Sequence, residues 1–378
     1  MSIQFKKILT KYNKKYLFSK NINSHCNPKK SFYNFFIIIP SYSEEAYLEH
    51  TLESISKQKA SILDKTLVVV VINNSVEDKL IIKNNNKRTY DKILKINFNF
   101  ELVILDYFSP RFSLPANLSG VGMARKIGMD FCINYSNENS LLCSIDADTL
   151  LNDKYLEIIN QEYLKYNFNA AVVNFRHQYS SDKDIQKAIL EYEKILKNIA
   201  KNLQLIGSRY GFVNMGSTII CKMYAYLVIG GMPSKKATED FYFLQKLAKY
   251  SPVHNIKDVL VYPSSRSEQR VYLGTGFRMN NIKKNIFFDD LYINPKAYNE
   301  IAEFYKIMEK KWNYKSSEIM SSLVKKNSKL WCYLEQNNFV NTINKIQKNK
   351  TDKVYVIEQF NRWFDSLKIY KFLKSYDK

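Results

Sequence analysis

Several patterns that would define a class of protein are scarce or absent in this chain of 378 residues. The five cysteines are odd in number and have no CxxC spacing, which argues against a disulfide framework and against a zinc site. No apolar run approaches the roughly 18 residues that cross a bilayer, and the N-terminus lacks the apolar stretch of a signal peptide. We therefore expect a cytoplasmic protein whose cysteines are reduced.

Acidic residues are also in short supply. The chain has 36 Asp and Glu against 57 Lys and Arg, a formal net charge of +21. This excess suggests a polyanionic neighbour, such as an acidic membrane surface, nucleic acid or a phosphorylated substrate. A general bias toward Lys, Asn, Ile and Tyr, which A/T-biased codons produce, explains the charge equally well, so charge alone does not choose a function.

The first 32 residues differ from the rest. Residues 1–30 contain eight lysines and no acidic residue. Apolar side chains are spaced to form one face of a helix: Phe5, Ile8, Leu9, Tyr12 and Tyr16. This basic amphipathic helix has two interpretations. It lies on an anionic membrane, as a peripheral contact on the inner face, or it docks on the protein's own core.

From residue 33 to about 280, short apolar runs alternate with amphipathic stretches. The expected strands are Phe35 to Ile39, Leu67 to Ile72, Phe100 to Leu105, Leu141 to Ile145, Ala170 to Phe175 and Val259 to Tyr262. The expected helices include Tyr47 to Lys57, Val121 to Tyr135, Lys154 to Tyr166 and Asp184 to Leu203. This alternation predicts an α/β domain with a mostly parallel sheet covered by helices on both faces. Residues 281–378 show only helical periodicity and predict a helical C-terminal region.

Polar residues directly follow three of the expected strands, where α/β sheets bind ligands. These segments are Pro40 to Glu45, Asn73 to Ser75, and Asp146-Ala147-Asp148. Two aspartates at positions i and i+2 of an extended chain point to the same side and can share one hard cation, Mn²⁺ or Mg²⁺. Such a cation would hold a diphosphate and neutralise the charge that develops on it as a leaving group.

A second acidic pair, Glu239-Asp240, follows Thr238 at the start of an expected helix. One interpretation is purely structural: Thr238 caps the helix, and the two acids compensate its dipole. The other is chemical, because a transferase that releases a diphosphate needs a base to deprotonate the attacking hydroxyl.

Taken together, residues 35–276 resemble a family 2 glycosyltransferase of the GT-A fold. Four segments carry the resemblance: Ile39 to Glu45, Gly122 to Gly128, the Asp146-Ala147-Asp148 motif, and Gly230-Gly231 ahead of Glu239-Asp240. The resemblance implies that Tyr42 borders the base, Arg125 helps to hold the donor, Asp146 touches the ribose or metal and Asp148 ligates the metal. It also implies that Asp240 is the base of an inverting reaction and that Glu239 supports it.

The resemblance implies an enzyme that moves a sugar from a nucleotide-diphosphate sugar, with a UDP-sugar as first expectation, to a glycan or lipid-linked acceptor. Two asparagines, Asn73 and Asn74, stand where the family often has aspartates, which puts uridine in doubt. The QxxRW motif of processive synthases is missing and no apolar run is long enough to cross a membrane, so we expect a non-processive enzyme. The predicted donor-binding residues are Pro40, Tyr42, Glu44, Asn74, Arg125, Asp146, Arg266 and Arg270.

Two further features bear on the site. The stretch Ser264 to Gly276 carries Arg266 and Arg270 and is either a lid that closes on the diphosphate or a solvated loop. His177 follows an expected strand and is a weaker candidate for the same cleft.

Alternative functions explain fewer of the motifs described above. A sugar nucleotidyltransferase would place a Gly-rich basic loop after the first strand, and an NAD-binding site would need the third glycine of GxGxxG, where Arg125 stands. A non-catalytic basic module of the same fold, binding nucleotide or an acidic polymer, would not require the paired carboxylates. No recognised nucleic-acid motif is present, so we expect no nucleic-acid partner.

Overall fold

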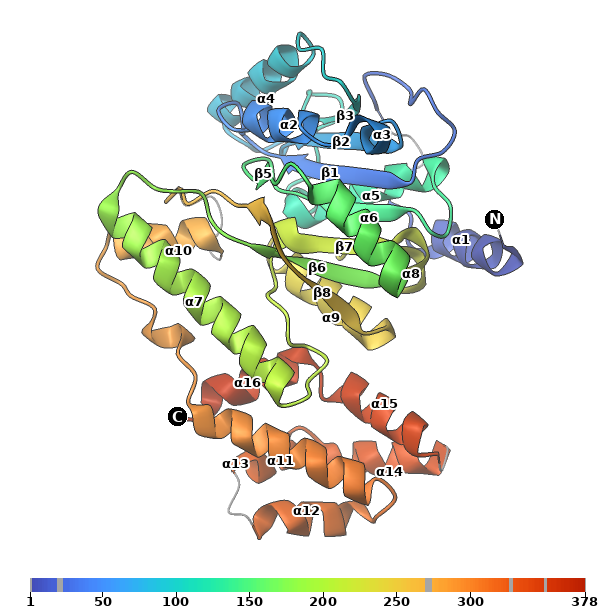
Figure 1. Ribbon diagram of the computed structural model, residues 1–378, viewed down its shortest axis with the longest axis vertical. Helices are drawn as coiled ribbons and strands as arrows, with labels where there is room; N and C mark the ends of the chain where they lie inside the picture. Colours follow the sequence, from blue (N-terminus) through green and yellow to red (C-terminus); the bar gives the residue numbers. More distant parts are fainter. Residues whose placement is uncertain (1, 19–22, 269–273, 326–328, 350–351, 378) are drawn as a thin grey trace. The chain divides into compact units, whose positions relative to one another are not determined.

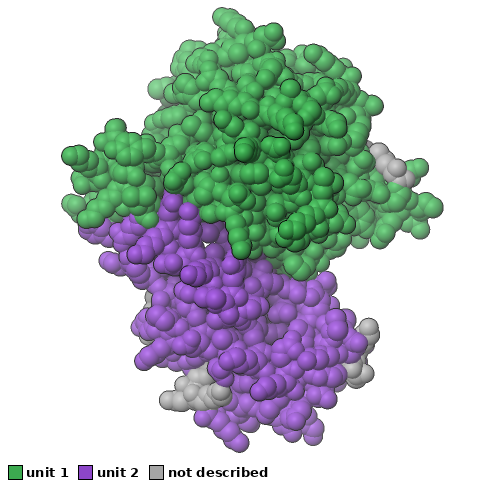
Figure 2. Space-filling view, in the orientation of Figure 1, with its two compact units in different colours: residues 1–190, 214–286 green, residues 191–213, 287–378 purple. Residues whose placement is uncertain are grey.

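The computed structural model describes residues 2–18, 23–268, 274–325, 329–349 and 352–377. The chain divides into two compact units (Figure 2). Unit 1 comprises Met1–Leu190 and Asn214–Ile286, and unit 2 comprises Glu191–Val213 and Phe287–Lys378.

Unit 1 is built on an eight-stranded sheet with the strand order β3-β2-β1-β4-β7-β6-β8-β5. The strands are β1 (Phe35–Ser41), β2 (Thr66–Asn73), β3 (Glu101–Tyr107), β4 (Leu141–Ser144), β5 (Leu150–Leu151), β6 (Ala170–Phe175), β7 (Ile219–Lys222) and β8 (Val253–Tyr262). Strands β3, β2, β1 and β4 run parallel to one another. Strand β7 runs antiparallel to both β4 and β6, β8 is parallel to β6, and β5 is antiparallel to β8. The mostly parallel sheet expected from the sequence is confirmed.

Helices cover the sheet of unit 1 (Figure 1). They are α1 (Ile3–Lys15), α2 (Leu48–Ser56), α3 (Ala60–Leu63), α4 (Leu80–Ile93), α5 (Val121–Cys132), α6 (Tyr155–Tyr166), the start of α7 (Lys183–Leu205), α8 (Met223–Val228), α9 (Glu239–Tyr250) and α10 (Thr275–Ile282). Every residue of β1 and β2 is buried, because helices pack on both of their faces. This explains why these strands read as unbroken apolar runs.

Close packing against the sheet accounts for one glycine of α5. A Cβ at Gly128 would lie 2.6 Å from Ile38 Cγ2 and 3.0 Å from Val71 Cγ2. The missing side chain lets α5 lie directly on β1 and β2. The N-terminus of this helix is thereby held over the edge of the sheet where the strands end.

The basic N-terminal helix docks on its own unit, one of the two interpretations drawn from its sequence. Phe5 and Tyr12 are buried, and the Tyr12 ring lies 5.6 Å from that of Tyr226 in α8. The Tyr12 hydroxyl donates to Asp130 Oδ1 at 2.6 Å. Five lysines of α1 remain exposed: Lys6, Lys7, Lys11, Lys14 and Lys15.

Unit 2 is helical throughout the part that the structure describes. It contains the second half of α7, then α11 (Pro295–Lys311), α12 (Ser316–Val324), α13 (Lys329–Gln336), α14 (Phe339–Asn349), α15 (Lys353–Trp363) and α16 (Ser366–Ser375). Phe304 is the centre of its core, with edge contacts to the rings of Phe339, Phe360 and Phe364 at 5.1 to 5.4 Å. None of the described helices in either unit is long and apolar enough to cross a membrane.

Candidate active site

One buried arginine joins the two acidic pairs that the sequence singled out. Arg125, in the second turn of α5, is 2% exposed. Its Nη2 forms an ion pair with Asp146 just after β4, and its Nη1 forms one with Glu239 at the start of α9. Its Nε donates to Ser144 Oγ at 2.9 Å. A single guanidinium thus connects the end of β4 with the beginning of α9.

Two glycines provide the space for this arrangement. A Cβ at Gly216 would overlap the guanidinium of Arg125. A Cβ at Gly122, one turn before Arg125, would lie 2.7 Å from the carbonyl oxygen of Pro233 and 2.9 Å from Glu239 Cβ. Glycine at these positions lets the segment before α9 pass directly over the N-terminus of α5, which brings Glu239 within reach of Arg125.

Asp146 is held from two sides and still reaches solvent. Ser217 Oγ donates to its Oδ2 at 2.6 Å, and the backbone N–H of Asp146 donates to the same hydroxyl at 3.2 Å. The Asp146 side chain keeps 36% of its surface exposed. This carboxylate is therefore fixed in place by Arg125 and Ser217 and accessible to a ligand.

Asp148, the second aspartate of the motif, is paired with Arg266. Arg266 Nη2 lies 2.7 Å from Asp148 Oδ2 and 2.8 Å from Glu44 Oε1. The Arg266 guanidinium carbon stands 4.2 Å from the centre of the Tyr47 ring, a cation–π contact. Burial opposes ionisation of Arg266, but the carboxylates of Asp148 and Glu44 raise its pKa overall.

The segment before α9 does not cap the helix as its sequence suggested. Thr238 has φ 63°, in the left-handed region, and its side chain makes no capping hydrogen bond. Its hydroxyl donates instead to the carbonyl of Ala237 at 2.6 Å. Capping by Thr238 was a wrong prediction. A β-branched residue in this conformation is strained, and such strain is typical of functional sites.

The acidic pair of α9 has raised pKa values. Burial raises the pKa of Glu239 to about 7, against the opposing effect of Arg125. Burial also raises the pKa of Asp240. Asp146 and Glu239 bind the Arg125 guanidinium and Asp240 lies near it, so repulsion among these carboxylates adds to the effect of burial. A carboxyl group with a pKa moved toward neutrality is suited to accept and release a proton at physiological pH.

The loops after β1 and β2 are tied together by Asn86 of α4. Its Nδ2 donates to Asn74 Oδ1 and to the Asn73 carbonyl, both at 3.0 Å, while its Oδ1 accepts from the Ser43 N–H at 2.8 Å. Asn74 Nδ2 in turn donates to Ser113 Oγ at 3.0 Å. Because the buried Asn74 amide is engaged at both ends, contact with a nucleobase would require it to release these partners.

The remaining predicted residues have varied surroundings. Pro40 is buried within β1, and the half-buried Tyr42 directs its hydroxyl toward Asp78 Oδ1 at 3.2 Å. The buried His177 packs edge-on against Phe175 and lies 3.2 Å from Thr275 Oγ1 through its Nε2. Arg270 lies outside the described residues.

Carboxylates capable of holding a divalent cation are present, but they are engaged with arginines. Among the described residues, no group of three or more His, Cys, Asp or Glu side chains is arranged to hold a metal ion. The oxygens of Asp146 and Asp148 are of the type that Mn²⁺ and Mg²⁺ prefer. A cation at this pair would need further oxygen ligands from a bound molecule and access to Asp148 beside Arg266.

Several residues of the site were not found from the sequence. Ser217 and Ser144 orient Asp146 and Arg125, Asn86 joins two loops, and Tyr47 stacks on Arg266. Serine and asparagine are common in loops and helices, so their types carried no signal. Ser217 lies just before β7, a strand that was itself not predicted.

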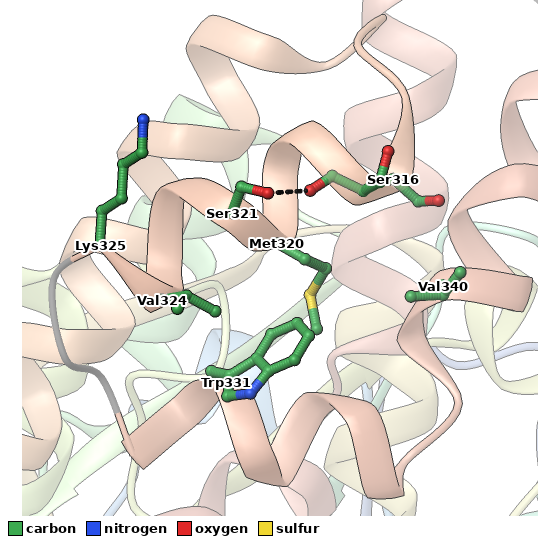
Figure 3. A pocket seen from close by; sticks show the side chains of 8 residues that line it. Ser316, Met320, Ser321, Val324, Lys325, Trp331 and Val340 are labelled. Atoms are coloured by element: carbon green, nitrogen blue, oxygen red, sulfur yellow. Dashed lines mark hydrogen bonds between the residues drawn. The ribbon is translucent and has the colours of Figure 1, made fainter.

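Unit 2 has an open hollow between α12, α13 and α14, lined by Ser316, Ser317, Met320, Ser321, Val324, Lys325, Trp331 and Val340 (Figure 3). Trp331 and Met320 lie side by side, and Ser321 Oγ donates to the carbonyl of Ser317 at 2.8 Å. Lys325 is the one ionisable residue of these eight. The hollow offers no acid–base pair comparable with that of unit 1.

Comparison with known proteins identifies the family. Residues 36–226, which are 191 of the 378 residues, match the family model described as glycosyl transferase family 2. No curated protein matches the chain. Similar solved structures include S. aureus TarS 1-349 in complex with UDP-GlcNAc, which is 15% identical with a TM-score of 0.45 over 86% of this chain and 90% of that one. Another is the mannosyltransferase PcManGT from Pyrobaculum calidifontis in complex with GDP-Man and Mn2+, 15% identical with a TM-score of 0.42 over 94% of each chain. The family match confirms the α/β, GT-A type of fold expected from the sequence, and the chain belongs to glycosyl transferase family 2.

Proposed function

We propose that this glycosyltransferase is a metal-dependent, inverting and non-processive enzyme. It moves a sugar from a nucleotide-diphosphate sugar to a hydroxyl group of a glycan or lipid-linked acceptor. The observation that carries the proposal is the buried link through Arg125 between Asp146, at the end of β4, and Glu239, beside Asp240. Arg125 fixes the position of Asp146, on the donor side, relative to Glu239, on the acceptor side. An enzyme that accelerates a reaction by orienting two substrates needs such fixed geometry.

Asp146 and Asp148 would hold Mn²⁺ or Mg²⁺ together with the diphosphate of the donor. When bound, the cation supplies the positive charge that stabilises the departing nucleoside diphosphate. The donor set fits this assignment, since both side chains are carboxylates at the end of a buried strand and Asp146 is accessible to ligands. Diphosphate oxygens would complete a coordination that these two residues cannot complete alone.

Asp240 is the better candidate for the base. Glu239 is 3% exposed and is bound to Arg125, whereas Asp240 is only half-buried and can face an acceptor. The raised pKa of Asp240 makes this carboxylate a stronger base, which favours removal of a proton from the attacking hydroxyl. Attack from the side opposite the departing diphosphate inverts the sugar's configuration. Glu239 supports Asp240 through Arg125.

The loops after β1 and β2 would receive the nucleoside. Tyr42 is half-buried and offers a ring against which a base can stack. Glu44 lies on the same loop, Pro40 is buried in β1 just before it, and Arg266 lies beside Glu44. We keep a UDP-sugar as the first donor to test. The side chain of Asn74 is hydrogen-bonded to Ser113 and Asn86, so we assign recognition of the base to residues next to Asn74.

A peripheral contact with an anionic membrane is proposed for α1. Phe5 and Tyr12 of its apolar face are buried in the protein's own core, so we assign the contact to its exposed lysines, which would make it electrostatic. Such a contact would bring the enzyme to a lipid-linked acceptor.

The proposal is tested by calorimetry with a panel of nucleotide sugars in the presence of Mn²⁺, using the full chain and its Asp148→Asn variant. We expect one donor to bind only with the metal present and the variant to remain folded but lose that binding. Unchanged donor affinity in Asp148→Asn would contradict the metal assignment. Release of nucleoside diphosphate from the bound donor, measured with and without acceptor candidates, then tests catalysis.

A further inference from the structure

Two carboxylates from different loops converge on one nitrogen of Arg266. Glu44 follows β1 and Asp148 follows β4, and their oxygens lie 2.8 and 2.7 Å from the same atom, Nη2. The Arg266 side chain is 11% exposed, and those of Glu44 and Asp148 are 5% and 15% exposed. The guanidinium of Arg266 therefore already binds Asp148, the aspartate to which the proposed function assigns a divalent cation.

Arg266 has other anchors besides Asp148. Its guanidinium lies over the Tyr47 ring, and its Nη1 is 3.5 Å from Glu268 Oε2. The Tyr47 hydroxyl also lies 3.4 Å from Glu268 Oε1 and donates to it. If the contact with Asp148 were lost, Glu44, Tyr47 and Glu268 would still hold the guanidinium close by. The side chain can therefore give up one partner without entering solvent.

A guanidinium bound to Asp148 opposes the binding of a divalent cation to the same carboxylate. Both are positive, and two positive charges a few ångströms apart repel strongly where solvent is largely excluded. The contact of Arg266 with Asp148 therefore disfavours occupation of this carboxylate by a cation.

We propose that Arg266 is a positioning residue that competes with the divalent cation for Asp148. In the absence of donor, it holds Asp148 in place and lowers the affinity of the enzyme for free metal. A cation that arrives with the donor's diphosphate has additional ligands and displaces the guanidinium. This inference rests on the proposed metal role of Asp148, but it adds a separate property: resistance to loading with metal alone.

Mn²⁺ titrations of the full chain without nucleotide test the proposal, with free Mn²⁺ measured by electron paramagnetic resonance. If Arg266 occupies Asp148 in roughly nine tenths of the molecules, Arg266→Gln binds Mn²⁺ about tenfold more tightly, because apparent affinity scales with the competent fraction. Arg266→Lys keeps the charge and stays close to the wild type. Lys257→Gln, an exposed residue of β8, removes the same charge without touching Asp148 and leaves the affinity unchanged.

The outcomes separate this proposal from the proposed function. If Asp148→Asn abolishes Mn²⁺ binding while Arg266→Gln binds no more tightly than the wild type, the competition is refuted and the metal site stands. If Asp148→Asn leaves Mn²⁺ binding unchanged, the metal role of Asp148 and the competition both fail. Should Arg266→Gln not fold, Tyr47→Leu loosens the guanidinium without changing any charge. Tighter Mn²⁺ binding by that variant supports the proposal, and unchanged binding overturns it.

Discussion

Arg125 and Glu239 are 114 residues apart in the chain and form an ion pair in which both side chains are at most 4% exposed. Asp146 binds the same guanidinium. Three segments of unit 1 therefore depend on one buried side chain: α5, the end of β4 and the start of α9. Because these charges are desolvated, each relies on its partners to remain ionised.

Replacing Arg125 by methionine removes the positive partner of the buried Glu239 and of the partly exposed Asp146. Loss of one member of a buried ion pair costs about 3–5 kcal/mol, so we expect a decrease of that size in the free energy of unfolding. Urea denaturation above pH 7, where Glu239 is ionised in the folded protein, measures it. The double variant Arg125→Met/Glu239→Gln should recover part of the loss, since it also removes one unpaired charge. A double variant that is less stable than Arg125→Met would contradict the pairing.

The fold could be predicted from the sequence where burial is continuous. Strands β1, β2, β4 and β6 were found because both of their faces are covered, so that nearly every residue is apolar. Strand β5 was not predicted because its two residues are too few to form a pattern, and β7 was not predicted either. The left-handed conformation of Thr238 was not predicted either, because β-branched residues rarely adopt it and the local sequence gives no sign of it.

The acids of the site were predicted, but their partners were not. Asp146, Asp148, Glu239 and Asp240 stood out because each pair follows a strand or starts a helix. The contact of Arg266 with Glu44 joins residues 222 positions apart, and no local pattern encodes such a pairing. Arg125 is predicted to help hold the donor, but its contacts with Asp146, Glu239 and Ser144 depend on tertiary packing and could not be predicted.

Gly216→Ala should disturb the site through Arg125. The added Cβ would overlap the guanidinium, so the arginine must move and weaken its contacts with Asp146 and Glu239. Overpacking of this kind typically costs about 1–3 kcal/mol. We expect the stability losses of Gly216→Ala and Arg125→Met to be non-additive in denaturation experiments, because both act on the same contacts. Strict additivity would show that Gly216 acts elsewhere.

The raised pKa of Glu239 predicts an unusual pH dependence of stability. Between its ordinary value of 4.5 and its folded value of about 7, Glu239 is protonated in the folded protein and ionised in the unfolded chain. The folded state then binds more protons, so the free energy of unfolding falls as the pH rises through this window. Denaturation at pH 5 and pH 7 measures the change. Glu239→Gln should reduce it, whereas Glu53→Gln, an exposed glutamate of α2, should not.

Asp240→Asn should lower turnover by about a hundredfold or more, the usual contribution of a general base, and should leave donor affinity unchanged. The asparagine keeps the size of the side chain but cannot accept a proton from the acceptor hydroxyl. Steady-state rates with saturating donor measure the effect, and calorimetry confirms donor binding. Near-normal turnover in a folded variant would exclude Asp240 as the base and would make Glu239 the next candidate.

The lysines of α1 should govern binding to anionic vesicles. Deleting the helix is a poor test, because Phe5 and Tyr12 belong to the core of unit 1. Replacing Lys6, Lys7 and Lys11 by glutamine removes exposed charge and keeps the packing. Each lysine near an anionic surface contributes about 1 kcal/mol, so co-sedimentation with phosphatidylserine vesicles should weaken by about a hundredfold.

The matched control removes three exposed lysines of unit 2, Lys296, Lys310 and Lys315, and so has the same net charge as the α1 variant. If both variants lose vesicle binding equally, attraction depends on total charge and α1 is not the contact surface. If only the α1 variant loses it, and added salt abolishes binding of the wild type, the contact is electrostatic and local to α1, because salt screens charge at a surface. Binding that survives high salt would instead require an apolar insertion, which the buried positions of Phe5 and Tyr12 do not provide.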